Sequence, residues 1–238
     1  MEKASIDEIR KRFDKDVERF SNLESGLTTM VDSPVMMELV TQAAAASNPQ
    51  ARQILDVGCG AGNYSLKFLE FVPDVDITLV DLSEPMLARA RERIGSLSKG
   101  EIQIIQGDIR EQAFPTAQFD VILAAAVLHH LRADDDWWEA FSKFHRILKP
   151  GGSVWIVDLI EQSTKAIQAM MWNRYGTYLT ELKDDAYREF VFGYIEKEDT
   201  PRPLTFQLDL LREVGFEEIE LLHKNNLFAA FGAIKKMR

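Results

Sequence analysis

The sequence predicts an α/β protein with a doubly wound, mostly parallel sheet. Short apolar segments alternate with longer amphipathic ones, a glycine-rich stretch follows the first apolar segment directly, and two β-like segments lie near the C-terminus. Strands and helices that alternate in this way require right-handed crossover connections. A ligand of such a sheet is expected outside the carboxyl ends of the strands, where the strand order reverses.

Five apolar segments have the length of buried parallel strands. Two further segments, 217–222 and 227–234, are separated by the turn-forming residues 223–226 and predict an antiparallel pair that completes a seven-stranded sheet. The five parallel strands are expected at 53–57, 77–82, 102–105, 119–126 and 154–160.

Helical segments fill the gaps between these strands. Ser83 is suited to cap a helix that begins at residue 84, with Pro85 in its first turn. The sequence Lys149-Pro150-Gly151-Gly152 is expected to end another helix at residue 148. The helices are predicted at 62–71, 84–94, 134–148 and 204–214, with Trp137, Trp138, Phe141, Phe144 and Leu148 on one face of the third.

The length of 238 residues fits one enlarged α/β domain. Within it we expect an N-terminal helical cap (1–50), a ligand-binding core (51–160), a helical cap insert (161–203) and the end of the sheet (204–238). Both caps are positioned in the sequence so that they could cover the ligand site.

The composition excludes several classes of protein. There are 28 Lys and Arg against 38 Asp and Glu, and the resulting net charge of −10 disfavours, without excluding, a nucleic-acid partner. One cysteine, Cys59, cannot form an internal disulfide, and four scattered histidines predict no metal site. No apolar run is long enough to span a membrane, so we expect a soluble cytoplasmic protein, either a monomer or a homodimer.

The glycine-rich stretch runs from Asp56 to Gly62 with the sequence Asp-Val-Gly-Cys-Gly-Ala-Gly. Its third glycine comes one position earlier than in the dinucleotide-binding fingerprint, where this chain has Asn63. Asp56 would repel a pyrophosphate, whereas it could bind an ammonium group or an ordered water. The loop therefore disfavours a polyphosphate ligand.

Two more carboxylates follow strands. Asp81 ends the second strand, where a carboxylate can accept hydrogen bonds from both hydroxyls of a ribose. Asp108 follows the third strand and could accept from an adenine amino group. Three strand-end acids around one glycine loop predict a single ligand site rather than three unrelated helix or turn caps.

At residues 50–160 the sequence resembles the class I S-adenosylmethionine-dependent methyltransferases. The resemblance implies their Rossmann-like fold and S-adenosylmethionine as cofactor, with the glycine loop around the methionine portion, Asp81 at the ribose and Asp108 beside the adenine. The cofactor-binding residues that it implies are Asp56, Gly58, Gly60, Ala61, Gly62, Asp81, Leu82, Met86, Asp108, Ile109 and Ala125.

The layout of the whole chain is also similar to the carboxy-S-adenosylmethionine synthase branch and its uncharacterised relatives. That branch holds the cofactor carboxylate with an arginine, whose position here falls at Phe192, with Arg188 one helical turn earlier. We therefore expect ordinary methyl transfer to a small molecule. The alternatives are a carboxy-S-adenosylmethionine synthase-like enzyme of tRNA wobble uridine modification and a non-catalytic protein that binds S-adenosylmethionine.

Methyl transfer by direct displacement depends on positioning and on exclusion of water, and it needs a base only when the acceptor must lose a proton. His129 and His130 follow the fourth strand and are candidates for that base, although the resemblance favours a role for the pair in packing the lid or the cofactor. The aromatic insert is expected to form the substrate pocket or the core of a small cap. The pocket candidates are Trp172, Tyr175, Tyr178 and Arg188.

The N-terminal segment carries interleaved acids and bases. Arg12 and Arg19 belong to this cluster, which predicts a solvated, salt-bridged helix face. Phe13 and Phe20 lie seven residues apart and are expected on a face that docks on the domain or closes over the cofactor.

Overall fold

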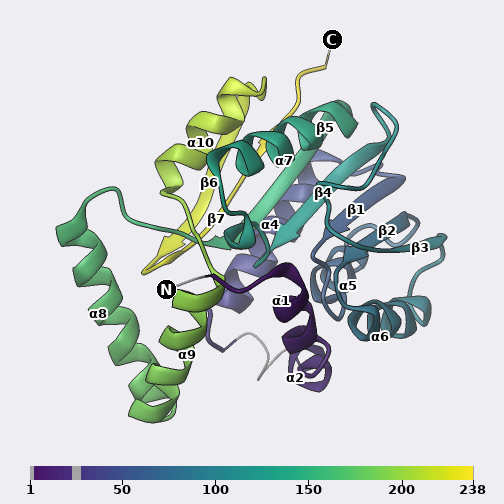
Figure 1. Cartoon of the computed structure of the whole chain (residues 1–238). Coiled ribbons are helices and arrows are strands. Elements are labelled where there is room, and N and C mark those ends of the chain that lie inside the picture. Colours follow the sequence, from purple (N-terminus) through teal and green to yellow (C-terminus); the bar gives the residue numbers. More distant parts are fainter. Residues whose placement is uncertain (1–2, 23–27, 238) are drawn as a thin grey trace.

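The computed structural model describes residues 3–22 and 28–237. Seven strands form one sheet in the order β3-β2-β1-β4-β5-β7-β6 (Figure 1). Strands β1 to β5 are parallel, and β7 runs antiparallel to both β5 and β6, as the sequence predicted. The strands are β1 (Gln53–Val57), β2 (Asp76–Asp81), β3 (Ile102–Gln106), β4 (Phe119–Ala125), β5 (Leu148–Leu159), β6 (Glu218–Asn225) and β7 (Phe228–Ile234).

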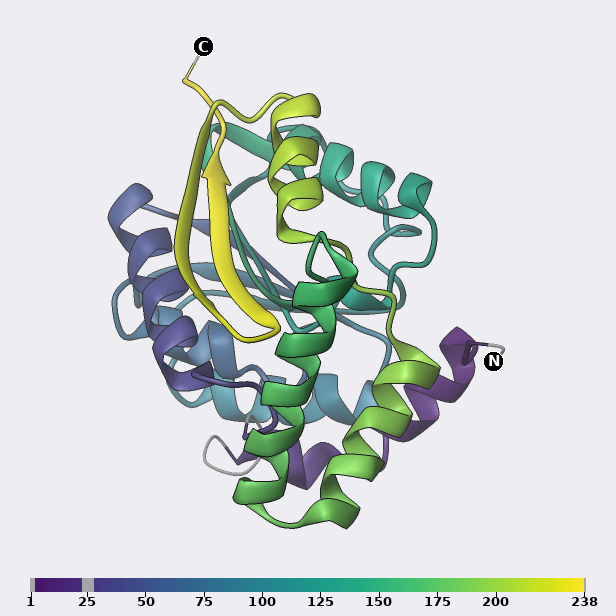
Figure 2. The same ribbon diagram turned by 90° about the vertical axis from the view of Figure 1, so that its left-hand side faces the viewer.

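Helices cover both faces of the sheet (Figures 1 and 2). One face packs on α4 (Ser33–Ser47), α5 (Asn63–Leu69) and α6 (Glu84–Gly95). The other packs on α7 (Asp134–Ile147) and α10 (Leu204–Glu213). The strand order reverses between β1 and β4, so the carboxyl ends of these two strands form the expected ligand-binding edge.

Two segments far apart in the sequence meet beyond that edge. Helices α8 (Lys165–Leu182) and α9 (Asp185–Glu198) form an antiparallel hairpin, and α1 (Ile6–Phe13) and α2 (Val17–Ser21) lie between α9 and the sheet (Figure 2). Within the described ranges, no helix is both long and apolar enough to cross a membrane. The division into caps and core stays a prediction, and its residues 1–2, 23–27 and 238 lie outside the described ones.

Helix α7 shows how local sequence sets the packing. Trp137, Phe141 and Phe144 are completely buried, because residues three and four apart share one helix face. Trp138 was expected on that face but is 51% exposed, since adjacent residues project about 100° apart around a helix with 3.6 residues per turn.

Two boundaries differ from those predicted by more than two residues. Strand β5 begins at Leu148, not at 154, because Leu148 pairs with Phe119 of β4 and the Lys-Pro-Gly-Gly sequence continues the strand across an irregular register. Strand β6 continues to Asn225, so most of the predicted turn at 223–226 is strand. The reversal occurs at Asn226, whose φ of +54° is tolerated by asparagine.

Two glycines provide a matched test of this packing. A Cβ added to Gly232 in β7 would lie 2.3 Å from the Trp155 side chain and 2.4 Å from the Val154 carbonyl oxygen. We expect Gly232→Ala to lower the free energy of unfolding by roughly 1–3 kcal/mol. Gly193 is exposed on α9 with nothing within 4 Å, so Gly193→Ala should raise it by about 0.5–1 kcal/mol. Urea denaturation of both variants tests this, and an unaffected Gly232→Ala would contradict the close packing of β5 and β7.

Candidate active site

The glycine loop joins β1 to α5, and each of its three glycines has a positive φ. A Cβ on Gly58 would lie 2.5 Å from the Val127 side chain, and one on Gly62 would lie 2.9 Å from Ile94. These two glycines therefore permit close packing of the loop on its neighbours. Gly60 has a φ of +50° and nothing within 4 Å of its Cβ position, so its backbone is open to a ligand.

Asp81 at the end of β2 faces this loop. Its two carboxylate oxygens accept hydrogen bonds from the backbone N–H of Gly60 at 2.8 Å and of Ser83 at 2.9 Å. Burial raises the pKa of Asp81, and these backbone bonds oppose that rise. Because each oxygen has more than one lone pair, the carboxylate can still accept from ligand hydroxyls.

Two adjoining cavities of about 730 and 710 Å³ lie along the carboxyl ends of the strands. We call the first the loop cavity, because the glycine loop lines it, and the second the edge cavity, because it extends toward β3. Both are lined by Gly58, Asp81, Leu82, Val127 and His130. Of the residues predicted to bind the cofactor, the loop cavity contains Gly58, Gly60, Ala61, Asp81, Leu82, Met86 and Ala125, and the edge cavity adds Asp108 and Ile109.

Asp56 and Gly62 line neither cavity. Asp56 is 1% exposed, and Ser65 of α5 donates a hydrogen bond to it at 2.6 Å. Burial raises the pKa of Asp56 to about 7. Its role in the structure is to fix α5 beneath the loop. Cys59 is buried, and burial raises the pKa of its thiol, which disfavours a reactive thiolate there.

Asp108 is already engaged by a neighbouring arginine. The Arg110 guanidinium lies 2.6 Å from one oxygen of Asp108 and 2.5 Å from Asp136. Burial would raise the pKa of Asp108, but the bonds from Arg110 outweigh it and hold the pKa below its usual value. Asp108 therefore faces the edge cavity as an ionised acceptor.

The two histidines differ sharply although they are adjacent. Nδ1 of His129 contacts the buried carboxylate of Asp158, and the His129 backbone N–H donates to the same group at 3.1 Å. Burial lowers the pKa of His129, but the negative charges of Asp158 and Asp199 outweigh this effect and raise the pKa to about 9. His129 is therefore an imidazolium at neutral pH, and this excludes it as a base there.

His130 has the opposite character. Burial and the positive charge of His129 lower its pKa, so the ring is neutral at pH 7. Its Nδ1 lies 3.2 Å from Asp199, and its buried Nε2 has no hydrogen-bond partner among the described residues. His130 lines both the loop and edge cavities, and its free nitrogen makes it the histidine able to accept a proton.

Asp199, which sequence reasoning did not single out, lies between the two rings. Ligand atoms of His129, His130 and Asp199 all lie within 4.8 Å of one another, which is close enough for one metal ion to bind them. The sequence predicted no metal site because the histidines alone do not form a ligand set. Folding adds the carboxylate of Asp199, at the end of α9, to the adjacent His129 and His130. In the structure the His129 imidazolium neutralises this carboxylate instead.

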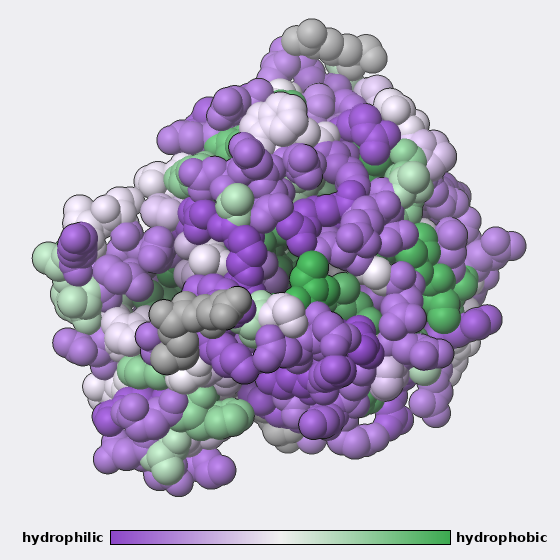
Figure 3. Space-filling view, viewed as in Figure 1, coloured by the Kyte–Doolittle hydropathy of each residue, from purple (hydrophilic) through white to green (hydrophobic). Residues whose placement is uncertain are grey.

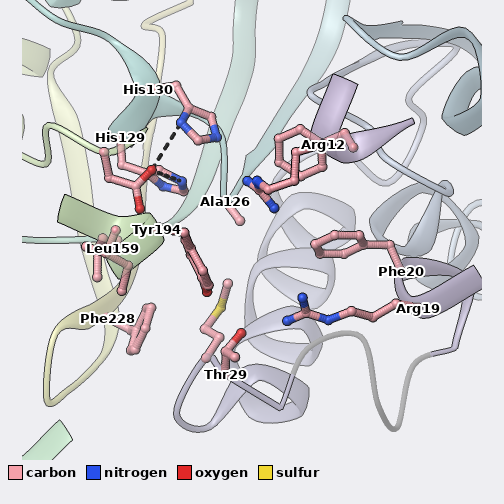
Figure 4. A pocket seen from close by; sticks show the side chains of 14 residues that line it. Arg12, Arg19, Phe20, Thr29, Ala126, His129, His130, Leu159, Tyr194 and Phe228 are labelled. Carbon is pink, nitrogen blue, oxygen red and sulfur yellow. Dashed lines mark ion pairs between the residues drawn. The ribbon is translucent and has the colours of Figure 1, made fainter. Parts of the chain in front are cut away.

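A third cavity, of about 660 Å³, lies between the sheet edge and α9, and we call it the cap cavity (Figure 4). It shares Phe13, Phe20, Ala126 and His130 with the loop cavity. Two arginines predicted on a solvated face, Arg12 and Arg19, line it instead. The remaining lining residues are Thr29, Met30, His129, Leu159, Tyr194, Ile195, Asp199 and Phe228.

The four predicted substrate-pocket residues line none of these three cavities. Trp172 stacks on Phe192 with ring centroids 4.5 Å apart, and the Tyr175 and Tyr178 hydroxyls donate to backbone carbonyls of Thr29 and Thr28. Arg188 forms ion pairs with Asp185 and Glu189. Of the two alternatives left open for the insert, these positions fit the core of a small cap, since the rings pack the cap hairpin and anchor the segment at 28–29.

The outer surface of this region is mostly hydrophilic, with apolar atoms exposed beside α1 (Figure 3). Ile6 and Ile9 of α1 line the edge cavity, and Ile6 is 47% exposed. The N-terminal helices thus form the outer wall of the predicted cofactor site, as expected for Phe13 and Phe20.

Comparison with known proteins agrees with this geometry. Residues 54–152 match a family model described as a methyltransferase domain. A demethylmenaquinone methyltransferase of Listeria monocytogenes is 25% identical over 190 residues, which cover 77% of this chain and 78% of that protein.

Two solved structures share the fold at low identity. Human N-acetylserotonin methyltransferase, in complex with S-adenosylmethionine, has a TM-score of 0.60 at 19% identity, covering 95% of this chain but only 56% of that longer one. The [4+2]-cyclase SpnF has a TM-score of 0.66 at 15% identity, covering 100% and 99% of the two chains.

These findings support a class I S-adenosylmethionine-dependent methyltransferase, with its methyltransferase domain at residues 54–152. Its cofactor is S-adenosylmethionine, which the open backbone at Gly60 and the carboxylate of Asp81 fit. The family resemblance seen in the sequence is confirmed at this level.

Replacing Asp81 tests the position of the cofactor. We expect Asp81→Asn to weaken binding of S-adenosylhomocysteine by several-fold to a hundredfold, in line with about 1–3 kcal/mol for lost hydrogen bonds to a charged group. Asp76→Asn, at the opposite end of β2, is the matched control and should leave the affinity unchanged. Calorimetry that gives both variants the wild-type affinity would remove Asp81 from the site.

The charge on His129 predicts a pH dependence of stability. Its folded pKa of about 9 exceeds the ordinary 6.5, so its ion pair stabilises the fold fully below pH 6.5 and less as the pH rises through 9. We expect the difference in free energy of unfolding between wild type and His129→Gln to shrink by roughly 3 kcal/mol over this range. His145→Gln is the control: this half-buried ring packs on Phe216 and burial lowers its pKa below 6.5, so the difference should stay nearly constant between pH 6.5 and 9. A constant difference for His129→Gln would contradict the buried ion pair.

Proposed function

We propose that this enzyme transfers a methyl group from S-adenosylmethionine to a small molecule bound in the cap cavity. The observation that carries the proposal is the junction between two cavities. The loop cavity and the cap cavity share Phe13, Phe20, Ala126 and His130, so ligands in the two would meet there. A displacement reaction needs its two reactants held in such direct contact.

S-adenosylmethionine, when bound, supplies an electrophilic methyl group on a positively charged sulfur. The residues of the chain provide the surroundings for its transfer. Asp81 and the backbone at Gly60 would hold the cofactor, while Phe13 and Phe20 form an apolar wall that excludes water from the junction. Their rings lie 5.6 Å apart and come from the two N-terminal helical segments.

His130 would accept the proton that a hydroxyl acceptor loses. Asp199 lies 3.2 Å from Nδ1 and favours the tautomer in which Nδ1 carries the proton. Nε2, which is buried and has no hydrogen-bond partner among the described residues, then keeps a free lone pair. His129 supports this arrangement from outside the reaction, because its positive charge lowers the pKa of His130 and keeps that ring neutral.

Two further facts favour a small-molecule acceptor. The net charge of −10 opposes the approach of a nucleic acid, and more than half of the residues that line the cap cavity are apolar or aromatic. The Listeria relative is named for methylation of demethylmenaquinone, itself a small molecule.

Substitution of His130 tests its role as a base. With a hydroxyl acceptor found by screening phenols for release of S-adenosylhomocysteine, His130→Gln should lower kcat by about 10²–10⁴-fold. Its affinity for S-adenosylhomocysteine should stay within about threefold of wild type, because no charge is lost from the cofactor site. The wild-type kcat should rise with pH through the pKa of His130, below 6.5, and then level off.

His145→Gln serves again as the control and should keep the wild-type kcat. An unchanged kcat in His130→Gln would assign proton removal to another group. If no phenol, thiol or amine in the screen releases S-adenosylhomocysteine while cofactor binding is tight, methyl transfer to such acceptors is refuted and the non-catalytic alternative gains support.

A further inference from the structure

The cap cavity contains two guanidinium groups that enter it from the same side (Figure 4). They are in different electrostatic states. Arg12 is neutralised by Glu198, to which its Nε donates two hydrogen bonds at 2.9 and 2.8 Å and its Nη2 makes an ion pair at 2.6 Å. The Arg12 guanidinium also lies over the Phe13 ring, 4.2 Å from its centroid.

Arg19 also lies over a ring, 5.2 Å from the centroid of Phe20, but it has no carboxylate partner as close as Glu198 is to Arg12. Its side chain is 27% exposed, its nearest carboxylate oxygen belongs to Asp16 at 3.8 Å, and it makes no hydrogen bond within residues 3–22 and 28–237. Asp16 also lies 3.7 Å from Arg12, so one carboxylate is shared between two cations. A guanidinium carries five N–H donors, and in Arg19 these are available to a ligand in the cavity.

The groups around Arg19 complete a polar end of the cavity. Thr29 lies near the Arg19 guanidinium, and Tyr194, which comes from α9 across the cavity, points its hydroxyl toward the same end (Figure 4). Burial raises the pKa of Tyr194 to about 12, so its hydroxyl stays protonated and can donate. The cavity therefore has a polar end at Arg19, an apolar middle formed by Leu159, Phe228 and Phe20, and the junction with the loop cavity at His130 and Ala126.

We infer that Arg19 binds a carboxylate of the methyl acceptor, whose apolar body crosses the cavity and presents its reactive group at His130. The inference rests on the proposed function and assigns the substrate class of the same site. A monoanion suits the site better than a phosphate dianion, because Asp16 already offsets part of the positive charge of Arg19. A planar carboxylate also matches the fork of a guanidinium.

Binding of paired probes tests this without catalysis. With S-adenosylhomocysteine present at saturation, 4-hydroxybenzoate and 3-(4-hydroxyphenyl)propanoate are each titrated against their primary amides by calorimetry. At least one acid should bind wild type about tenfold or more tightly than its amide, as expected for a charge-assisted pair. Arg19→Gln should abolish that preference, whereas Arg174→Gln, which removes an exposed arginine of α8, should retain it.

Several outcomes would overturn the inference. These are equal binding of acid and amide to wild type, absence of acid binding at the highest soluble concentration, and a preference that survives in Arg19→Gln. Tighter binding of phenyl phosphate than of either acid would show that Arg19 prefers a phosphomonoester to a carboxylate. If Arg19→Gln weakens the binding of S-adenosylhomocysteine, the guanidinium binds the cofactor and not the acceptor. Acids that bind through Arg19 but are never methylated would support the carboxylate site and contradict its use by the methyl acceptor.

Discussion

The hydrogen bond from the Gly60 backbone to the Asp81 carboxylate, 2.8 Å long, is the interaction on which the site depends. It joins the end of β2 to the loop that follows β1, and so fixes the bare backbone and the strand-end acid in one place. Parallel strands alone would bring their carboxyl ends to one edge, but they would not set the position of the loop. Gly58 and Gly62 complete the constraint by letting Val127 and Ile94 pack where a side chain would otherwise lie.

The second half of the site comes from the two caps, which hold each other. Arg12 of α1 pairs with Glu198 at the end of α9, and Arg132 donates to the carbonyls of Ala4 and Glu198. The backbone of Thr200 donates to the His129 carbonyl at 2.7 Å. These contacts place Asp199 against the histidine pair, so the protonation states of His129 and His130 depend on chain segments nearly 190 residues apart. Opening the N-terminal helices would therefore expose the cofactor and disturb the proposed base together.

The strands and the glycine loop were predictable because their signals are local. The segment Gln53–Val57 is apolar and is followed at once by glycines, so β1 and the loop needed no tertiary information. Asp81 was predicted for the same reason. The different roles of His129 and His130 were not predictable, since they depend on Asp158 and Asp199, which reach the pair only after folding. Aromatic composition likewise could not separate Tyr194, which lines the cap cavity, from Tyr175, which packs beneath it.

Fold similarity does not settle the reaction, since SpnF, a [4+2]-cyclase, shares this architecture over its whole length. The central claim is that the cofactor lies across Asp81 with its sulfur at the junction of the loop and cap cavities. A crystal structure with S-adenosylhomocysteine bound tests it most directly. We expect the ribose hydroxyls within hydrogen-bond distance of Asp81 and the sulfur beside Ala126 and His130. A ligand whose sulfur is separated from the cap cavity by protein, or whose ribose does not touch Asp81, would contradict it.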